Sequence, residues 1–189
     1  MIISDDGGGE ITFDNGSTWS SIYNMPTAQF YRVNVDNMFP YNLYGGQQDN
    51  STIKISSIGS RGGISERDWS ASAGGESAFL AFDPDDPSIV MGGSYLGSIN
   101  IFDTKANARK KVMIEPINYI GRASRDMKYR FNWNAPIIWS QHEQNTFYHA
   151  AQHLFKTNDQ GKSWKIVSPD LTRDEDEKQG NGGGPYTNE

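Results

Sequence analysis

The chain has 189 residues with 17 basic and 23 acidic side chains, which gives a formal net charge of −6. This balance disfavours a nucleic-acid partner, because such binding depends mainly on Lys and Arg side chains that neutralise phosphates. No run approaches the roughly 18 apolar residues that a membrane-spanning helix needs, so we expect no membrane span. Cysteine is absent, which excludes disulfides, thiol nucleophiles and thiolate metal sites.

Short segments rich in β-branched and aromatic residues alternate with turns rich in Gly and Pro along the whole sequence. No long segment has the 3.6-residue period of an amphipathic helix. This pattern predicts an all-β fold of short strands and tight turns. In chain order, the clearest predicted strands are residues 30–35, 52–55, 89–91, 98–102 and 163–167.

A repeat of about 47 residues runs through the chain. Asp36 and Tyr44-Gly45-Gly46 recur 47 residues later as Asp83 and Met91-Gly92-Gly93. A third, weaker copy ends in His149-Ala150-Ala151, 58 residues after the second. We interpret the additional length as an insertion between repeats. A repeat of this size with four short strands is typical of a propeller blade.

A second motif, Ser/Thr-x-Asp-x-Gly-x-Ser/Thr-Trp, occurs twice, and equivalent positions of the two copies are 145 residues apart. In such a turn we expect the Asp to accept backbone N–H groups, the Gly to supply a positive φ, and the Trp to pack beneath the hairpin. Trp69 is also expected to pack in or between blades. The motif residues are Thr12, Asp14, Gly16, Thr18 and Trp19 in the first copy, and Thr157, Asp159, Gly161, Ser163 and Trp164 in the second.

These two motifs resemble the Asp-box, or BNR repeat, of sialidases, xyloglucanase-type glycoside hydrolases and sortilin-like (VPS10) propellers. Further motifs look like those of a large, mostly bacterial group labelled BNR-repeat glycosyl hydrolases or sortilin N-terminal-like proteins. These are Asp6-Gly7-Gly8-Gly9, Gln29-Phe30-Tyr31-Arg32-Val33, Tyr44-Gly45-Gly46-Gln47-Gln48-Asp49-Asn50, Arg67-Asp68-Trp69, Gly74-Gly75-Glu76-Ser77, Tyr129-Arg130-Phe131-Asn132-Trp133 and Ser168-Pro169-Asp170-Leu171-Thr172-Arg173.

The resemblance implies a β-propeller of four-stranded blades with Asp-box turns. Because proteins of this group are longer, we expect the 189 residues to be a propeller fragment with an incomplete ring of three to four blades. Its expected partners are the remaining blades of a parent chain or further copies of itself. The expected blades are residues 1–23 (partial), 28–72, 77–115 and 135–168, with an insertion at 116–134 and a polar tail at 169–189.

The resemblance also places ligand sites of such propellers on the face that carries the loops between second and third strands and between blades. Asp49 and Glu76 are the candidate catalytic carboxylates there, since glycoside hydrolysis commonly uses an acid and a base or nucleophile. The alternative is structural: Asp49 closes a turn with Asn50, and Glu76 accepts backbone hydrogen bonds. The candidate ligand-binding residues are Gln47, Gln48, Asn50, Tyr95, Arg125 and His153.

Other kinds of site are less well supported by the sequence. The three histidines, His142, His149 and His153, lack the spacing of a metal site, and neither a metal nor a cofactor is predicted. Arg and Tyr residues of the types that sialidases use are present without a matching motif. The function expected first is a module that binds a glycan or protein ligand; the alternative is a xyloglucanase-like glycoside hydrolase. A secreted, periplasmic or cell-surface location follows from the resemblance.

Overall fold

A computed structural model describes residues 1–5, 8–24 and 27–180. Within these ranges the fold consists of three four-stranded antiparallel sheets and a two-stranded hairpin, with short 3-10 turns and no α-helix. The predicted all-β class is therefore confirmed. Asp6, Gly7 and the last part of the tail, residues 181–189, lie outside the described residues. No helix in the described part is long and apolar enough to cross a membrane.

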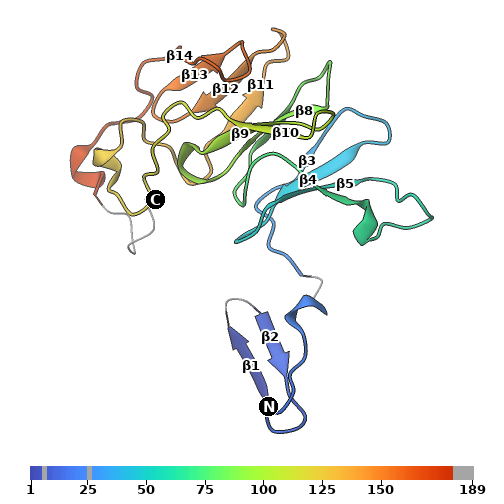
Figure 1. The fold of residues 1–189 in the computed structure, drawn as a ribbon. Coiled ribbons are helices and arrows are strands. Elements are labelled where there is room, and N and C mark those ends of the chain that lie inside the picture. The colour runs from blue at the N-terminus through green and yellow to red at the C-terminus, as the bar shows by residue number, and fades with distance from the viewer. Residues whose placement is uncertain (6–7, 25–26, 181–189) are drawn as a thin grey trace.

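In every four-stranded sheet, spatial neighbours are also neighbours in the sequence (Figure 1). The hairpin lies apart from these sheets in the same view. The strands are β1 (Ile2–Asp5) and β2 (Gly8–Ile11) in the hairpin; β3 (Asn34–Val35), β4 (Asn42–Gly46), β5 (Thr52–Ser56) and β6 (Trp69–Ala71) in the first sheet; β7 (Leu80–Phe82), β8 (Ile89–Gly93), β9 (Ile99–Asp103) and β10 (Ala108–Lys111) in the second; and β11 (Ile137–Trp139), β12 (Phe147–Ala150), β13 (Leu154–Thr157) and β14 (Lys165–Ile166) in the third.

Short 3-10 turns lie in the connections rather than in the sheets. They are η1 (Ile22–Asn24), η2 (Glu66–Asp68), η3 (Tyr95–Gly97), η4 (Ser124–Asp126) and η5 (Asp176–Lys178). The expected strand 30–35 is shorter than predicted. Phe30 makes only an isolated bridge to Gln47, and the ladder with β4 is interrupted near Arg32, whose guanidinium carbon lies 3.3 Å from the centroid of the Phe79 ring.

Strands β7, β8 and β9 of the second sheet are largely buried on both faces, whereas β10 is exposed. Successive side chains of a strand point to opposite faces, and in β8 Val90 packs into a core shared with the first sheet while Met91 packs into a core shared with the third. Both side chains are fully buried. A further core lies between the insertion and the third sheet, where Phe131 and Phe155 pack together. The second sheet can thus pack between the first and the third because its strands carry apolar residues on both faces.

The repeated Gly-Gly motif has a steric reason. A Cβ atom on Gly46 would lie 2.3 Å from the Glu76 carbonyl oxygen, and one on Gly92 would lie 2.4 Å from the Ala73 carbonyl carbon. Both contacts are impossible for a side chain. At each position the backbone of the segment joining the first two sheets passes directly against the end of a second strand. Glycine there permits the close approach that brings these sheets together.

Two of the three tryptophans expected in or between blades are more exposed than predicted. Trp164 is partly buried and donates its indole N–H to the Val112 carbonyl at 2.9 Å. Trp19 is instead 38% exposed to solvent, and Trp69 is 52% exposed. The expectation is wrong for Trp19 because, among the described residues, the hairpin lies apart from the four-stranded sheets (Figure 1). It is wrong for Trp69 because β6 is an edge strand.

Candidate functional site

The turns at opposite ends of the sheets form two separate groups. At one end, the amide of Asn37 donates to the Pro84 carbonyl at 2.8 Å, and that of Gln144 donates to the Asp85 carboxylate at 3.2 Å. These bonds link the turns that join the first and second strands of successive sheets. At the other end lie the β4–β5 loop and the β6–β7 segment, which contain most of the predicted site residues.

Glu76 fastens these two loops together. It is 8% exposed, and its Oε2 accepts the Asp49 backbone N–H at 2.7 Å and the Gln48 side-chain amide at 3.3 Å. Asp49 itself is exposed and has a φ of 53°, so it occupies the left-handed region in a tight turn. The structure therefore brings the two predicted carboxylate residues together through the Asp49 backbone. Their proposed catalytic roles stay predictions.

Three aromatic residues connect the Gln48–Glu76 contact to the second sheet and the insertion. The Trp133 indole N–H donates to the Tyr31 hydroxyl at 3.2 Å, and that hydroxyl donates to the Gln48 side-chain oxygen. The Trp133 ring stacks on Tyr95, with 4.8 Å between centroids and 22° between planes. We call Tyr31, Gln48, Glu76, Tyr95 and Trp133 the loop-face cluster. Sequence reasoning missed Tyr31 and Trp133 as site residues, although both lie within motifs that carried the family resemblance.

The other predicted ligand-binding residues lie outside this cluster. Gln47 and Asn50 close the β4–β5 turn, since the Gln47 amide donates to the Ser51 carbonyl at 3.0 Å and the Asn50 side-chain oxygen accepts the Ser51 N–H at 3.1 Å. Arg125 is exposed and donates to the Gln179 carbonyl. The His153 ring packs edge-on against Phe155, and its buried Nδ1 has no described partner.

The two Asp-boxes have the same internal hydrogen bonds. In the second, Asp159 accepts the Ser163 N–H at 2.9 Å and the Ser163 hydroxyl at 2.6 Å, while Thr157 accepts the Gly161 N–H at 2.9 Å. The first box repeats these bonds from Asp14 and Thr12. The neighbouring hydroxyl, that of Ser163 or Thr18, is the main cause that lowers the pKa of each carboxyl to about 2. These residues stabilise turns.

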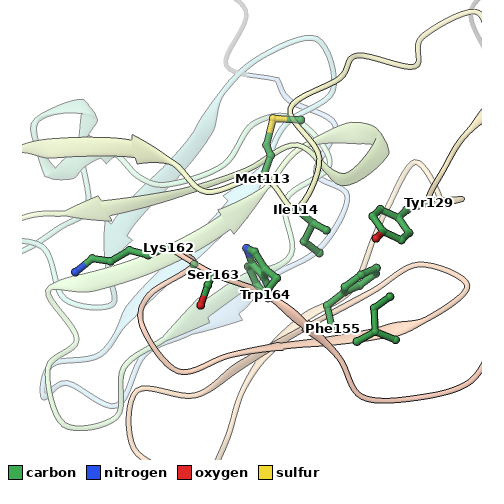
Figure 2. Close-up of a pocket in the computed structure, with 9 residues that line it drawn as sticks. Met113, Ile114, Tyr129, Phe155, Lys162, Ser163 and Trp164 are labelled. Atoms are coloured by element: carbon green, nitrogen blue, oxygen red, sulfur yellow. The ribbon is translucent and has the colours of Figure 1, made fainter.

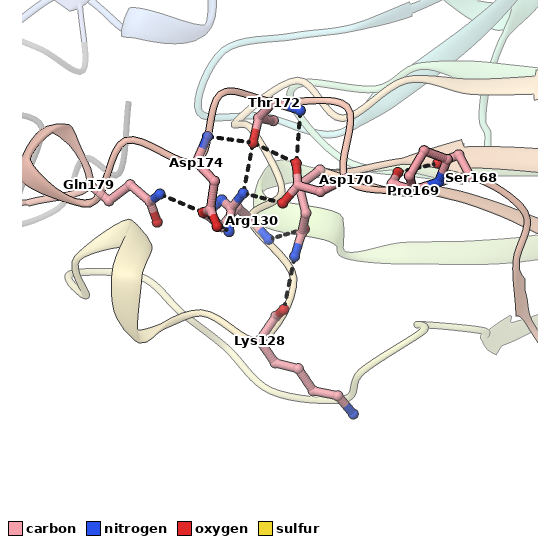
Figure 3. A network of polar contacts seen from close by, with 9 residues as sticks. Lys128, Arg130, Ser168, Pro169, Asp170, Thr172, Asp174 and Gln179 are labelled. Atoms are coloured by element: carbon pink, nitrogen blue, oxygen red, sulfur yellow. Dashed lines mark hydrogen bonds and ion pairs between the residues drawn. The ribbon is translucent and has the colours of Figure 1, made fainter.

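Arg130, which was predicted only as part of the insertion, binds the chain that follows β14 (Figure 3). Its guanidinium donates to Asp170 at 2.7 Å and to Thr172 at 2.8 Å, and it forms an ion pair with Asp174 at 3.0 Å. Its backbone N–H donates to the Gln152 side chain at 2.7 Å. The Thr172 hydroxyl, with Arg130, lowers the pKa of Asp170 to about 2. These contacts fix the tail against the insertion.

A cavity of about 430 Å³ opens between the segment after β10 and the second Asp-box. Figure 2 shows Trp164 below Ile114 and beside Phe155, with Tyr129 completing the apolar wall and Lys162 extending away from it. The described residues contain no group of three or more His, Asp or Glu side chains arranged to hold a metal ion.

Comparison of the sequence with protein-family models and with curated proteins gives no match. The chemistry of the site is therefore interpreted from its geometry. The loop-face cluster combines three partly buried aromatic rings with an amide and a carboxylate, and such groups suit binding of a ligand that has both apolar surfaces and hydroxyl or amide groups.

Proposed function

We propose that the chain is part of an Asp-box β-propeller whose loop-face cluster binds a glycan or protein ligand, with a glycan as the first choice. The propeller is supported by three successive sheets of four antiparallel strands in chain order and by two Asp-boxes with matching hydrogen bonds. It is further supported by the first strands of the second and third sheets, β7 and β11, which lie side by side. Consecutive blades of a propeller have these features.

The binding proposal rests on the stacked rings of Tyr95 and Trp133, whose centroids are 4.8 Å apart. Hydrogen bonds connect Trp133 through the Tyr31 hydroxyl to Gln48, and Gln48 to Glu76. Aromatic rings pack against the apolar faces of sugars, and amide or carboxylate oxygens accept their hydroxyl protons. Glu76 already accepts two hydrogen bonds from the β4–β5 loop. This use of its carboxylate favours a binding role over hydrolysis.

Affinity electrophoresis through gels that contain single polysaccharides, beginning with xyloglucan and other neutral β-glucans, tests this function. We expect retardation by at least one polysaccharide and an affinity about tenfold lower for Tyr95→Ala, because removal of a central aromatic contact typically has this effect. Trp69→Ala is the matched control, since Trp69 is exposed and lies on β6, outside the cluster.

Two results would contradict the proposal. Equal weakening by Tyr95→Ala and Trp69→Ala would place the binding surface elsewhere, and migration unaffected by any polysaccharide would remove the glycan as ligand. Release of reducing sugar that is lost in Glu76→Gln, with binding retained, would instead support the glycoside hydrolase hypothesis.

A further inference from the structure

The outer strand of the second sheet has an open edge. Within the described residues β10 pairs only with β9, and all four of its residues are exposed. The Val112 N–H donates to the Ile99 carbonyl at 3.1 Å. Because paired and unpaired residues alternate in an antiparallel ladder, the backbone N–H and C=O groups of Arg109 and Lys111 point to the open edge.

This edge is basic although the chain as a whole is acidic. Arg109, Lys110 and Lys111 are consecutive and exposed, and in the described part of the chain none of them forms an ion pair. The Arg109 guanidinium lies over the Phe102 ring at 4.5 Å, which leaves its positive charge at the surface. Lys162, on the second Asp-box, is likewise exposed and outside the described ion pairs.

The basic edge leads directly to the cavity beside Trp164. Val112 packs against Gly161, where an added Cβ would lie only 2.6 Å from the Val112 Cβ. Lys110 lies two residues before Val112 and therefore on the same face of the strand, while Lys162 follows Gly161. Two positive charges thus flank the contact between the sheets, and the apolar wall begins at Met113 and Ile114 just beyond it.

We propose that the β10 edge and this cavity bind an extended acidic segment of a partner protein by strand addition. The segment pairs with the free backbone groups of Arg109 and Lys111. Its acidic side chains meet Lys110 and Lys162, and an apolar side chain enters the cavity beside Trp164. Main-chain bonds supply affinity in this mode of recognition, and pockets for alternate side chains supply specificity.

Charge selects this partner over a second copy of the chain. Basic residues directly opposite one another are destabilising in paired strands, so two β10 edges repel each other and an acidic strand is favoured. The acidic segment after β14 is a poor substitute, because Asp170 and Asp174 are already bound to Arg130.

Fluorescence anisotropy with a labelled peptide, Gly-Glu-Val-Glu-Val-Phe-Ser-Gly, whose Glu and Phe side chains share one face of an extended strand, tests the proposal against the same peptide with Lys in place of Glu. We expect the acidic peptide alone to bind. The double variant Lys110→Glu with Lys162→Glu should weaken its affinity about tenfold or more, since both reversed charges face the peptide. Arg61→Glu with Arg67→Glu makes the same change of net charge on the exposed β5–β6 loop and should leave the affinity nearly unchanged.

Hydrogen exchange separates strand addition from attraction by charge alone. Bound peptide should increase protection of the Arg109 and Lys111 amides, and Ile166→Glu, at a half-exposed position in the cavity lining, should weaken binding without loss of the sheets. Equal effects of the two double variants, or unchanged protection of these amides, would overturn the proposal. Binding of dextran sulfate in place of the peptide would indicate a polyanion surface and would overturn it too.

Discussion

At the scale of single residues, His149 is the most unusual titratable group. It is 1% exposed, it stacks on Phe131 at 4.8 Å, and its Nδ1 lies 2.8 Å from the Pro136 carbonyl oxygen. Nδ1 therefore donates, which leaves Nε2 without a proton in the neutral ring. Burial is the main cause that lowers its pKa from 6.5 to about 4, against the opposing effect of the Pro136 carbonyl.

This shift makes stability depend on pH. The unfolded chain binds a proton at His149 near pH 6.5, whereas the folded chain resists protonation until about pH 4, so stability is lost as the pH falls through this window. Linkage gives a loss of about 2 kcal/mol in the free energy of unfolding between pH 7 and pH 5. Urea unfolding at several pH values measures it. His149→Gln should flatten the dependence and the exposed His142→Asn should retain it; a slope unchanged in His149→Gln would contradict the assignment.

At the scale of elements, Arg130 holds the segment after β14 in place. Its side chain is 18% exposed and contacts Asp170 and Asp174. We expect Arg130→Ala to speed tryptic cleavage after Arg173 about tenfold, because loss of a charge-assisted hydrogen bond typically costs about 1.5–3 kcal/mol. Lys128→Ala is the matched control, since the Lys128 side chain is 63% exposed and its nearest carboxylate is Glu115 at 3.9 Å. Equal cleavage rates for the two variants would show that the tail is held by other contacts.

Contacts between residues close in the sequence are predicted well, and contacts between distant residues are not. The Asp-boxes follow from the sequence because their hydrogen bonds join residues two to four positions apart, as from Thr157 to Asp159 and from Gly161 to Thr157. The contacts of the loop-face cluster do not. Trp133 and Tyr31 lie 102 positions apart, and their meeting depends on how the insertion folds over the third sheet, which no local pattern encodes. The same holds for Arg130 and Asp170, 40 positions apart.

At the scale of the whole molecule, two nearly identical turns have different surroundings. In the second Asp-box, Gly161 packs against Val112 and Trp164 bonds to the Val112 carbonyl, so the turn joins two sheets. In the first, a Cβ on Gly16 would meet only Met1 and Trp19, both in or next to the hairpin itself. The two turns therefore have the same internal hydrogen bonds, but only the second packs against the core between two sheets.

The matched substitutions Thr12→Val and Thr157→Val test this difference. Each threonine is 2% exposed, and each variant leaves a Gly N–H without its acceptor, partly buried at Gly16 and buried at Gly161; loss of a buried hydrogen-bond partner typically costs about 1–3 kcal/mol. Thr157→Val should lower the urea midpoint of all three sheets, because its turn is part of the core between the second and third. Thr12→Val should lower that of the hairpin alone. Hydrogen exchange during unfolding reports these regions separately, and equal losses in the sheets for both variants would mean that the hairpin folds as part of them.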